Sequence, residues 1–164
     1  MKHLILMRHG KAEKDNGALA DFDRKLVERG IQDVGLVAKA LGKSIFLPQL
    51  LVASPAMRTK STALLVSKEL KIKNVELDTS IYEASINDLM HVIREFDDQY
   101  DTVMVVGHNP SITGIVGYLT DTFIEHVPTS GIVVVKFDEA TWKLTKSRAG
   151  KVVWNQTPKG IPLV

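Results

Sequence analysis

The stretch Leu4-Ile5-Leu6-Met7-Arg8-His9-Gly10 runs four apolar residues directly into a guanidinium, an imidazole and a glycine. A short apolar run bounded by glycine is typical of a buried strand. Open α/β folds bind their ligands at the carboxyl edge of the sheet, where such a strand ends. An arginine at that edge can bind an anion, and the adjacent histidine can attack it. The stretch therefore predicts a sheet with a reactive anion site at its edge.

Two later apolar runs end in a similar way. Leu50–Ala53 leads into Ser54-Pro55, and Thr102–Val106 leads into Gly107-His108-Asn109-Pro110. Ser-Pro and Asn-Pro pairs are typical of a helix N-cap followed by proline at the first helical position. We therefore expect a helix to begin directly after each of these two strands.

The remaining elements are predicted from periodicity. Leu26–Leu41 has the apolar spacing of a helix, and Gly42 is a suitable stop for it. The other expected elements are helices ending near Leu70, at Asn87–Phe96 and near Leu119, a weak strand at Val75–Leu77, and a β-hairpin formed by Ile132–Phe137 and Trp142–Ser147. This alternation predicts an α/β fold: a three-layer α/β/α sandwich whose mainly parallel sheet has an antiparallel C-terminal edge.

Composition limits the classes of function. A chain of 164 residues with 45% apolar residues is expected to form one domain over residues 1–164. Because the net charge is only +2, no basic field points to nucleic acid. The chain has no cysteine, which excludes a disulfide, a thiolate metal site and a cysteine nucleophile. The N-terminal apolar run is too short for a signal peptide or a membrane span, so we expect a cytoplasmic protein without membrane contact.

The three polar strand ends should meet along one edge of the sheet. Two histidines and two arginines would then converge beside two helix N-termini, whose N–H groups attract anions. Phosphate is the commonest dianion that such a pocket would bind. A neutral histidine is then the best available nucleophile, and neighbouring arginines keep it unprotonated. Gly10 would let the backbone approach the phosphate, Lys11 would place a charge near the mouth, and no metal is required.

This combination resembles the histidine phosphatase superfamily through Arg8-His9-Gly10, Arg58 and His108. Within that superfamily the chain looks like the SixA-type phosphohistidine phosphatase branch. Larger members insert a lid between the second helix and the Thr102 strand, so the resemblance implies a domain without a large lid insertion. The segments that carry the SixA-type resemblance are Asp21-Phe22-Asp23-Arg24-Lys25-Leu26…Gly30, Val52-Ala53-Ser54-Pro55…Arg58-Thr59 and Val106-Gly107-His108-Asn109.

The resemblance also implies roles for individual residues. His9 would be the nucleophile that becomes phosphohistidine, and His108 would be a protonated partner that stabilises the transferring phosphoryl group. Arg8, Arg24 and Arg58 would hold the phosphate oxygens. The expected substrate-binding set is Arg8, Gly10, Arg24, Arg58 and Asn109, with no cofactor and no metal.

Three readings of function stay open from the sequence. The leading one is a metal-independent phosphatase acting on phosphohistidine carried by a partner protein. A second is a phosphomonoesterase for small phosphate esters, which would need Glu83 as a general acid because an alkoxide leaving group requires a proton. A third is a phosphate-dependent binding module without catalysis. The sequence gives no sign of oligomeric state and does not name the physiological substrate.

Overall fold

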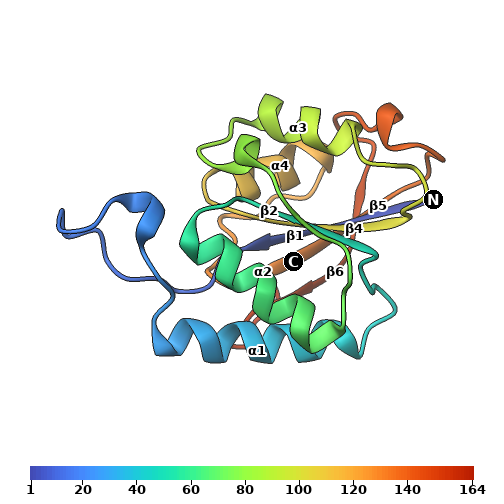
Figure 1. Cartoon of the computed structure of the whole chain (residues 1–164). Coiled ribbons are helices and arrows are strands. Elements are labelled where there is room, and N and C mark those ends of the chain that lie inside the picture. The colour runs from blue at the N-terminus through green and yellow to red at the C-terminus, as the bar shows by residue number, and fades with distance from the viewer.

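Strand β1 (Lys2–Arg8) lies inside a six-stranded sheet of order β3-β2-β4-β1-β5-β6 in the computed structural model, which describes residues 1–164 (Figure 1). β1 pairs in parallel with β4 (Thr102–Gly107), and β4 pairs in parallel with β2 (Leu50–Ala53), which pairs with β3 (Val75–Leu77). The other neighbour of β1 is antiparallel: β5 (Ile132–Phe137), which pairs with β6 (Lys151–Gln156). The expected parallel sheet with an antiparallel C-terminal edge is confirmed.

Helices cover both faces of the sheet (Figure 1). One face carries α1 (Glu28–Gly42) and α2 (Met57–Leu70), and the other carries α3 (Ile86–Arg94) and α4 (Ser111–Leu119). Three short 3₁₀ turns complete the chain: η1 (Asp21–Asp23), η2 (Thr79–Ile81) and η3 (Trp142–Leu144). The three-layer sandwich predicted from the sequence is therefore correct.

Alternate residues of β1 belong to the two separate cores. Leu4 and Leu6 lie in a cluster of 21 buried residues under α3 and α4. Ile5 and Met7 lie in a cluster of 14 buried residues under α1 and α2. All four side chains are 0% exposed, and burying each contributes about 1.5–3 kcal/mol. This two-sided burial holds the end of β1 firmly between its neighbours.

The second strand of the predicted hairpin, Trp142–Ser147, is wrong. Trp142–Leu144 is a 3₁₀ turn, and the strand that pairs with β5 is β6. The Trp142 ring is fully buried against Phe96, with 5.4 Å between ring centroids, and its indole N–H donates to the Tyr100 carbonyl at 2.8 Å. Because Trp142 is packed into the core in this way, Trp142–Leu144 covers the core at the amino end of β1 and does not form a strand.

Both predicted helix starts are also displaced toward the C-terminus. α2 begins at Met57 with Ala56 at the N-cap, and α4 begins at Ser111 with Pro110 at the N-cap. Ser54 and Asn109 therefore lie outside the helices, and their side chains are available for other contacts. Both helices end where the sequence predicted, at Leu70 and Leu119.

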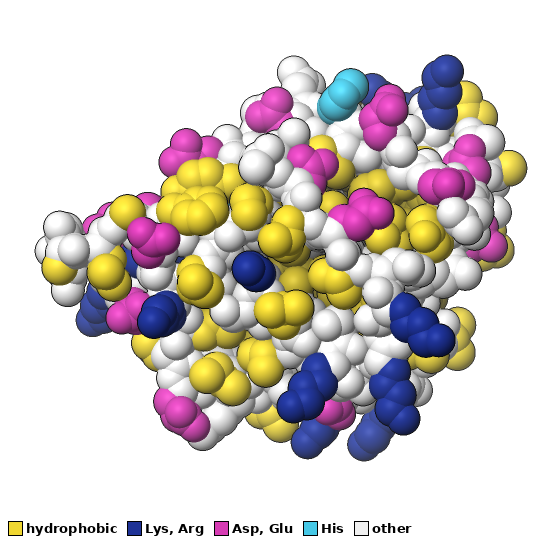
Figure 2. Space-filling view, in the orientation of Figure 1, with side chains coloured by type: hydrophobic (Ala, Val, Ile, Leu, Met, Phe, Trp, Pro, Cys, Tyr) yellow, Lys and Arg dark blue, Asp and Glu magenta, His cyan; other side chains and the backbone are white.

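The outer surface over α1 and α2 mixes apolar with charged side chains (Figure 2). Ile31 and Leu36 on α1 and Leu64 on α2 are among the exposed apolar residues, and the space-filling view shows such side chains interspersed with basic ones. None of the helices is both long enough and apolar enough to cross a membrane.

Candidate active site

Three neighbouring strands deliver polar residues to one edge of the sheet, as the sequence predicts. The residue that follows β1 is His9, whose backbone N–H donates to the Gly107 carbonyl at the end of β4 at 3.1 Å. His108 follows β4 directly, and Ser54 follows β2. The Ser54 backbone N–H donates to the Val106 carbonyl at 3.2 Å. The parallel register of the three strands therefore fixes how these residues lie relative to one another.

His9 is held with one ring nitrogen engaged and the other available. Its side-chain Nδ1 lies 2.7 Å from the Gly10 carbonyl oxygen. A carbonyl only accepts hydrogen bonds, so Nδ1 carries the proton and Nε2 keeps its lone pair. The His9 ring lies 5.3 Å from the His108 ring, centroid to centroid. The imidazole therefore presents a nucleophilic nitrogen next to the second histidine.

Burial and charge keep His9 neutral. The pKa of His9 is lowered from 6.5 to about 3, mainly by burial and in addition by the nearby basic groups His108, Arg58 and Arg8. The Gly10 carbonyl, which favours the protonated ring, opposes this shift without overcoming it. At neutral pH the ring is therefore unprotonated and able to attack, as the sequence analysis expected from its arginine neighbours.

His108 is oriented by a hydroxyl group. Its Nε2 lies 2.9 Å from Ser54 Oγ, which also accepts a hydrogen bond from the Ala56 backbone N–H at 3.3 Å. The Ser54 hydroxyl hydrogen is thus free to donate to Nε2. When Ser54 donates to Nε2, the ring proton lies on Nδ1, which is buried and has no hydrogen-bond partner.

His108 is neutral in the ligand-free protein, and its protonated state beside a transferring phosphoryl group stays a prediction. The pKa of His108 is lowered from 6.5 to about 4, mainly by burial and in addition by the charge of Arg58, so the ring is neutral at pH 7. The neutral ring can still donate one hydrogen bond through Nδ1. A bound dianion would raise the pKa of His108, because an opposite charge favours the protonated form.

Arg58 and Arg24 share one carboxylate. The Arg58 side chain, only 6% exposed, donates to the Asp21 backbone carbonyl at 2.7 Å and to Asp21 Oδ2 at 3.1 Å. Arg24 donates to Asp21 Oδ1 from Nε at 3.1 Å and from Nη2 at 2.8 Å. The Tyr82 hydroxyl donates to Asp21 Oδ2 at 2.8 Å, and the Tyr82 ring lies 5.6 Å from the His108 ring. Asp21 thus joins both arginines and the tyrosine beside the histidines.

The carboxylate of Asp21 is ionised throughout the physiological range. Partial burial would raise its pKa, but the hydrogen bonds from Tyr82, Arg24 and Arg58 outweigh that effect and lower the pKa to about 2. The hydrogen bond between Tyr82 and Asp21 in turn raises the pKa of Tyr82 to about 12. Asp21 therefore orients cationic side chains and has no proton to give at neutral pH.

The loop before β5 anchors Arg8 and Asn109. Arg8 Nη1 and Asn109 Nδ2 both donate to the Val127 carbonyl, at 3.2 Å and 2.9 Å. Asn109 Oδ1 accepts hydrogen bonds from the backbone N–H and the hydroxyl of Thr113. Both ends of the Asn109 amide therefore bind protein groups that hold the loop, and the contact of Asn109 with substrate stays a prediction.

Unpartnered polar atoms are concentrated at this edge of the sheet. Five buried side-chain polar atoms lack a hydrogen-bond partner, and four of them belong to Arg8 (Nε), Arg58 (Nε), His108 (Nδ1) and Ser130 (Oγ). Leaving a buried polar group unsatisfied costs about 1–3 kcal/mol, so such atoms are rare in folded proteins. Their concentration around His9 is explained by a ligand with several acceptor oxygens, such as a phosphoryl group.

Gly10 packs closely against α1, and its predicted part in letting the backbone approach a phosphate stays a prediction. A Cβ at this position would lie 2.8 Å from Val34 Cγ2 and 3.1 Å from the Gly30 carbonyl oxygen. The missing side chain therefore allows the segment after β1 to pack against α1, and this contact with the helix explains the glycine. The Gly10 N–H donates to Thr62 Oγ1 at 3.0 Å, which ties the segment to α2 as well.

Glu83 does not join this network. It is exposed and forms neither a hydrogen bond nor an ion pair, and its backbone has a positive φ of 54°. The preceding residue, Tyr82, makes the contact to Asp21 instead. No three His, Asp or Glu side chains are grouped where they could hold a metal ion.

Sequence reasoning missed the parts played by Asp21, Ser54 and Tyr82. In the sequence Asp21 appeared only within the segment that carries the family resemblance, and Ser54 only as a helix N-cap. A strand-end hydroxyl beside a strand-end histidine was the signal available for Ser54. Tyr82 carries no local signal, because η2 brings it to Asp21 from a distant part of the chain.

Comparisons with known proteins identify the family of the chain and agree with its fold. The sequence model of the histidine phosphatase superfamily (branch 1) matches residues 4–100. An uncharacterized protein of Mycobacterium tuberculosis is 29% identical over 140 residues, covering 79% of this chain and 86% of that protein. The protein histidine phosphatase SixA complexed with tungstate has a TM-score of 0.81 at 22% identity, covering 96% of this chain and 97% of that one. A mycobacterial glucosyl-3-phosphoglycerate phosphatase complexed with VO3 has a TM-score of 0.70 at 16% identity, covering 94% and 99%.

Proposed function

Because the chain belongs to the histidine phosphatase superfamily (branch 1), whose members are phosphatases, we propose that it hydrolyses phosphohistidine through a covalent intermediate on His9. The observation that carries this proposal is the 2.7 Å contact between His9 Nδ1 and the Gly10 carbonyl. That contact leaves the lone pair of His9 Nε2 free to attack. Arg8, Arg58 and His108 nearby have buried nitrogens without a hydrogen-bond partner.

The reaction has two transfers. His9 Nε2 attacks the phosphorus in line, the N–P bond to His9 forms, and the bond to the leaving group breaks. Water then attacks the phosphorus, the His9 N–P bond breaks, and inorganic phosphate leaves while Nε2 recovers its lone pair. Arg8 and Arg58 donate to the equatorial oxygens, where charge is spread in the transition state. His108 Nδ1–H supplies a further donor.

The electrostatics of the site favour a leaving group that needs little help from an acid. Asp21 is the carboxylate that contacts the arginines, and with a pKa of about 2 it cannot donate a proton at neutral pH. Glu83 forms no hydrogen bond to the network. An imidazole protonated on its second nitrogen leaves without further protonation, whereas an alkoxide does not. A phosphohistidine on a protein is therefore the substrate class that fits best, and the SixA fold similarity supports it.

A small phosphate ester is the second candidate. It is supported by the fold similarity to glucosyl-3-phosphoglycerate phosphatase. This reading requires Glu83 to act as the acid, although the residue is exposed in the ligand-free protein. A Glu83→Gln variant separates the two substrates: ester hydrolysis would fall at least tenfold, while phosphohistidine hydrolysis would stay within twofold of wild type.

The decisive experiment traps the intermediate. The protein is mixed with a radiolabelled phosphohistidine peptide, quenched within milliseconds, and tested for acid-labile, alkali-stable label. We expect label on the wild type and none on His9→Ala. The matched control is His91→Ala, since His91 is an exposed histidine on α3. An unlabelled wild type, or equal labelling of His9→Ala, would overturn the proposal in favour of a binding module.

A further inference from the structure

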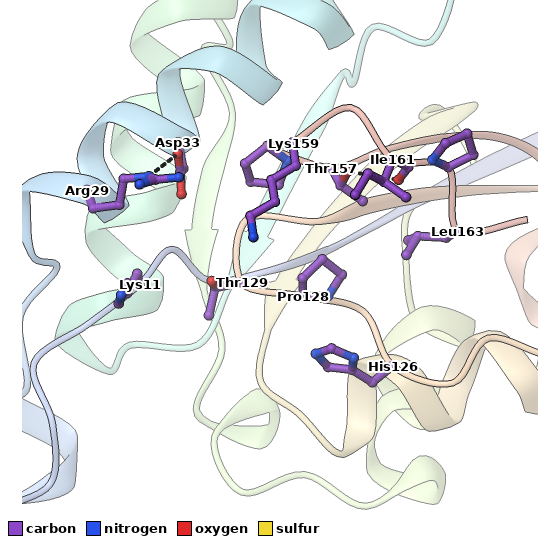
Figure 3. A pocket seen from close by; sticks show the side chains of 12 residues that line it. Lys11, Arg29, Asp33, His126, Pro128, Thr129, Thr157, Lys159, Ile161 and Leu163 are labelled. Carbon is purple, nitrogen blue, oxygen red and sulfur yellow. Dashed lines mark hydrogen bonds and ion pairs between the residues drawn. The ribbon is translucent and has the colours of Figure 1, made fainter.

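A hollow of about 520 Å³ lies between the β1–α1 loop, the loop before β5 and the C-terminal segment (Figure 3). This volume falls in the range of ligand-binding clefts, about 300–1,000 Å³. None of the residues that line the hollow is among the residues assigned above to phosphoryl transfer. The walls come from segments far apart in the sequence, represented by Lys11, Thr129 and Lys159.

The hollow carries an unbalanced positive charge. Arg29 is paired with Asp33 at 3.0 Å, so these two charges cancel. Lys11 and Lys159 are exposed and form no ion pair or hydrogen bond. In Figure 3 the Lys159 side chain extends across the hollow toward Thr129 and Pro128. His126 and the Thr129 hydroxyl add further polar groups at the same place. The lining is therefore suited to an anionic group.

The hollow lies next to the nucleophile. Lys11 follows His9 by two residues, so their Cα atoms are at most ~7.6 Å apart, given 3.8 Å between successive Cα atoms. On the opposite wall, Thr129 precedes Ser130, whose backbone N–H donates to the His9 carbonyl at 3.0 Å. Two walls of the hollow are therefore continuous along the backbone with segments that hold His9.

We propose that this hollow, called here the lysine pocket and defined by Lys11, Lys159 and Thr129, docks an acidic side chain of the phosphorylated protein. The inference rests on the proposed function, because the docked segment is the one that carries the phosphohistidine. An extended chain spans ~3.3–3.6 Å per residue, so the acidic residue is two or three positions from the phosphohistidine. A protein segment fits because it offers an acidic side chain to the lysines together with apolar groups to Ile161 and Leu163 in the lining.

The test compares two phosphohistidine peptides that differ only in having aspartate or asparagine two and three positions from the phosphohistidine. We expect kcat/KM to be about tenfold higher for the acidic peptide at low salt, through a lower KM with unchanged kcat. This ratio should shrink at 0.5 M salt, because screening weakens exposed charge pairs. In the Lys11→Gln/Lys159→Gln variant the acidic peptide should fall to the level of the neutral peptide, with turnover of the neutral peptide within twofold of wild type.

The control is Lys143→Gln, an exposed lysine in η3 at the opposite end of the sheet. Binding of the unphosphorylated peptides to His9→Ala, followed by fluorescence anisotropy, measures docking without turnover. If neither peptide is hydrolysed but the acidic one still binds through the two lysines, the proposed function fails and the lysine pocket stands. Docking of a protein segment would be overturned by equal kcat/KM for both peptides, or by an unchanged ratio of the two kcat/KM values in the double variant. It would also be overturned if free malonate bound more tightly than the acidic peptide.

Discussion

Replacing Asp21 with asparagine should weaken the fold and the phosphate site together. The carboxylate accepts four side-chain hydrogen bonds, two from Arg24, one from Arg58 and one from Tyr82. An amide can accept at only one of its two ends, so about two of these bonds are lost. The Asp21 side chain is 38% exposed, so solvent screening limits each loss to about 0.5–1 kcal/mol. We expect the free energy of unfolding to fall by about 1–2 kcal/mol.

The same substitution should reduce activity, because Arg58 loses the partner that orients it. A loss of about 1.4 kcal/mol in transition-state binding corresponds to a tenfold lower kcat/KM. The effect on unfolding should also depend on pH. The pKa of Asp21 is lowered from 3.8 to about 2, so its contribution is complete above pH 4 and disappears as the pH falls toward 2. Wild type and Asp21→Asn should therefore converge in stability at the acid end of this range.

Urea unfolding from pH 7 to pH 2, together with steady-state kinetics and orthovanadate binding, measures all three effects. Asp23→Asn is the matched control, because Asp23 lies in the same 3₁₀ turn, is exposed and forms no hydrogen bond through its side chain. The reasoning is refuted if Asp21→Asn unfolds like Asp23→Asn at pH 7. It is also refuted if Asp21→Asn binds vanadate more tightly than wild type, since Asp21 would then compete with the anion for the arginines.

Two further predictions concern the packing and the protonation of the site. Gly30→Ala would place a Cβ 2.1 Å from the Lys11 carbonyl oxygen, so we expect destabilisation of at least about 3 kcal/mol by urea unfolding, whereas Gly35→Ala in the same helix meets open space and should stabilise by up to about 1 kcal/mol. Equal effects of the two glycine substitutions would contradict this account. The pKa of His9 is lowered from 6.5 to about 3, so its ring should stay neutral in NMR titrations down to pH 4, and its contribution to stability should fall as the pH drops from 6.5 toward 3. A His9 titration midpoint near 6.5 would show that burial does not control the nucleophile.

Much of the scaffold could be predicted because its signals are local. The apolar runs of β1, β2 and β4 are buried on both faces, and a run of this kind is recognisable without knowing its neighbours. The polar residues at their ends converge because parallel strands share a carboxyl edge. His9, Arg8 and His108 could therefore be placed together from the sequence.

What could not be predicted depends on contacts between distant segments. Whether Trp142 forms a strand or a turn is decided by Tyr100 and Phe96, which it meets only in the folded core. The protonation of His108 depends on burial, and no sequence pattern reports the burial of a single ring. Asp21 and Tyr82 meet through a contact between two 3₁₀ segments that carry no periodicity.

The position of β1 in the sheet also has a consequence for how the protein is made. β1 leaves the ribosome before both of its partner strands, because Leu4 pairs with Val103 on one side and Val135 on the other. Contacts between residues so far apart in the chain slow folding, because a large loop must close before either pairing forms. During synthesis β1, which is apolar and precedes the nucleophile, therefore stays unpaired until β4 and β5 have emerged. A chaperone that binds short apolar segments would be expected to act at this strand, and catalytic competence would be the last property that the nascent chain acquires.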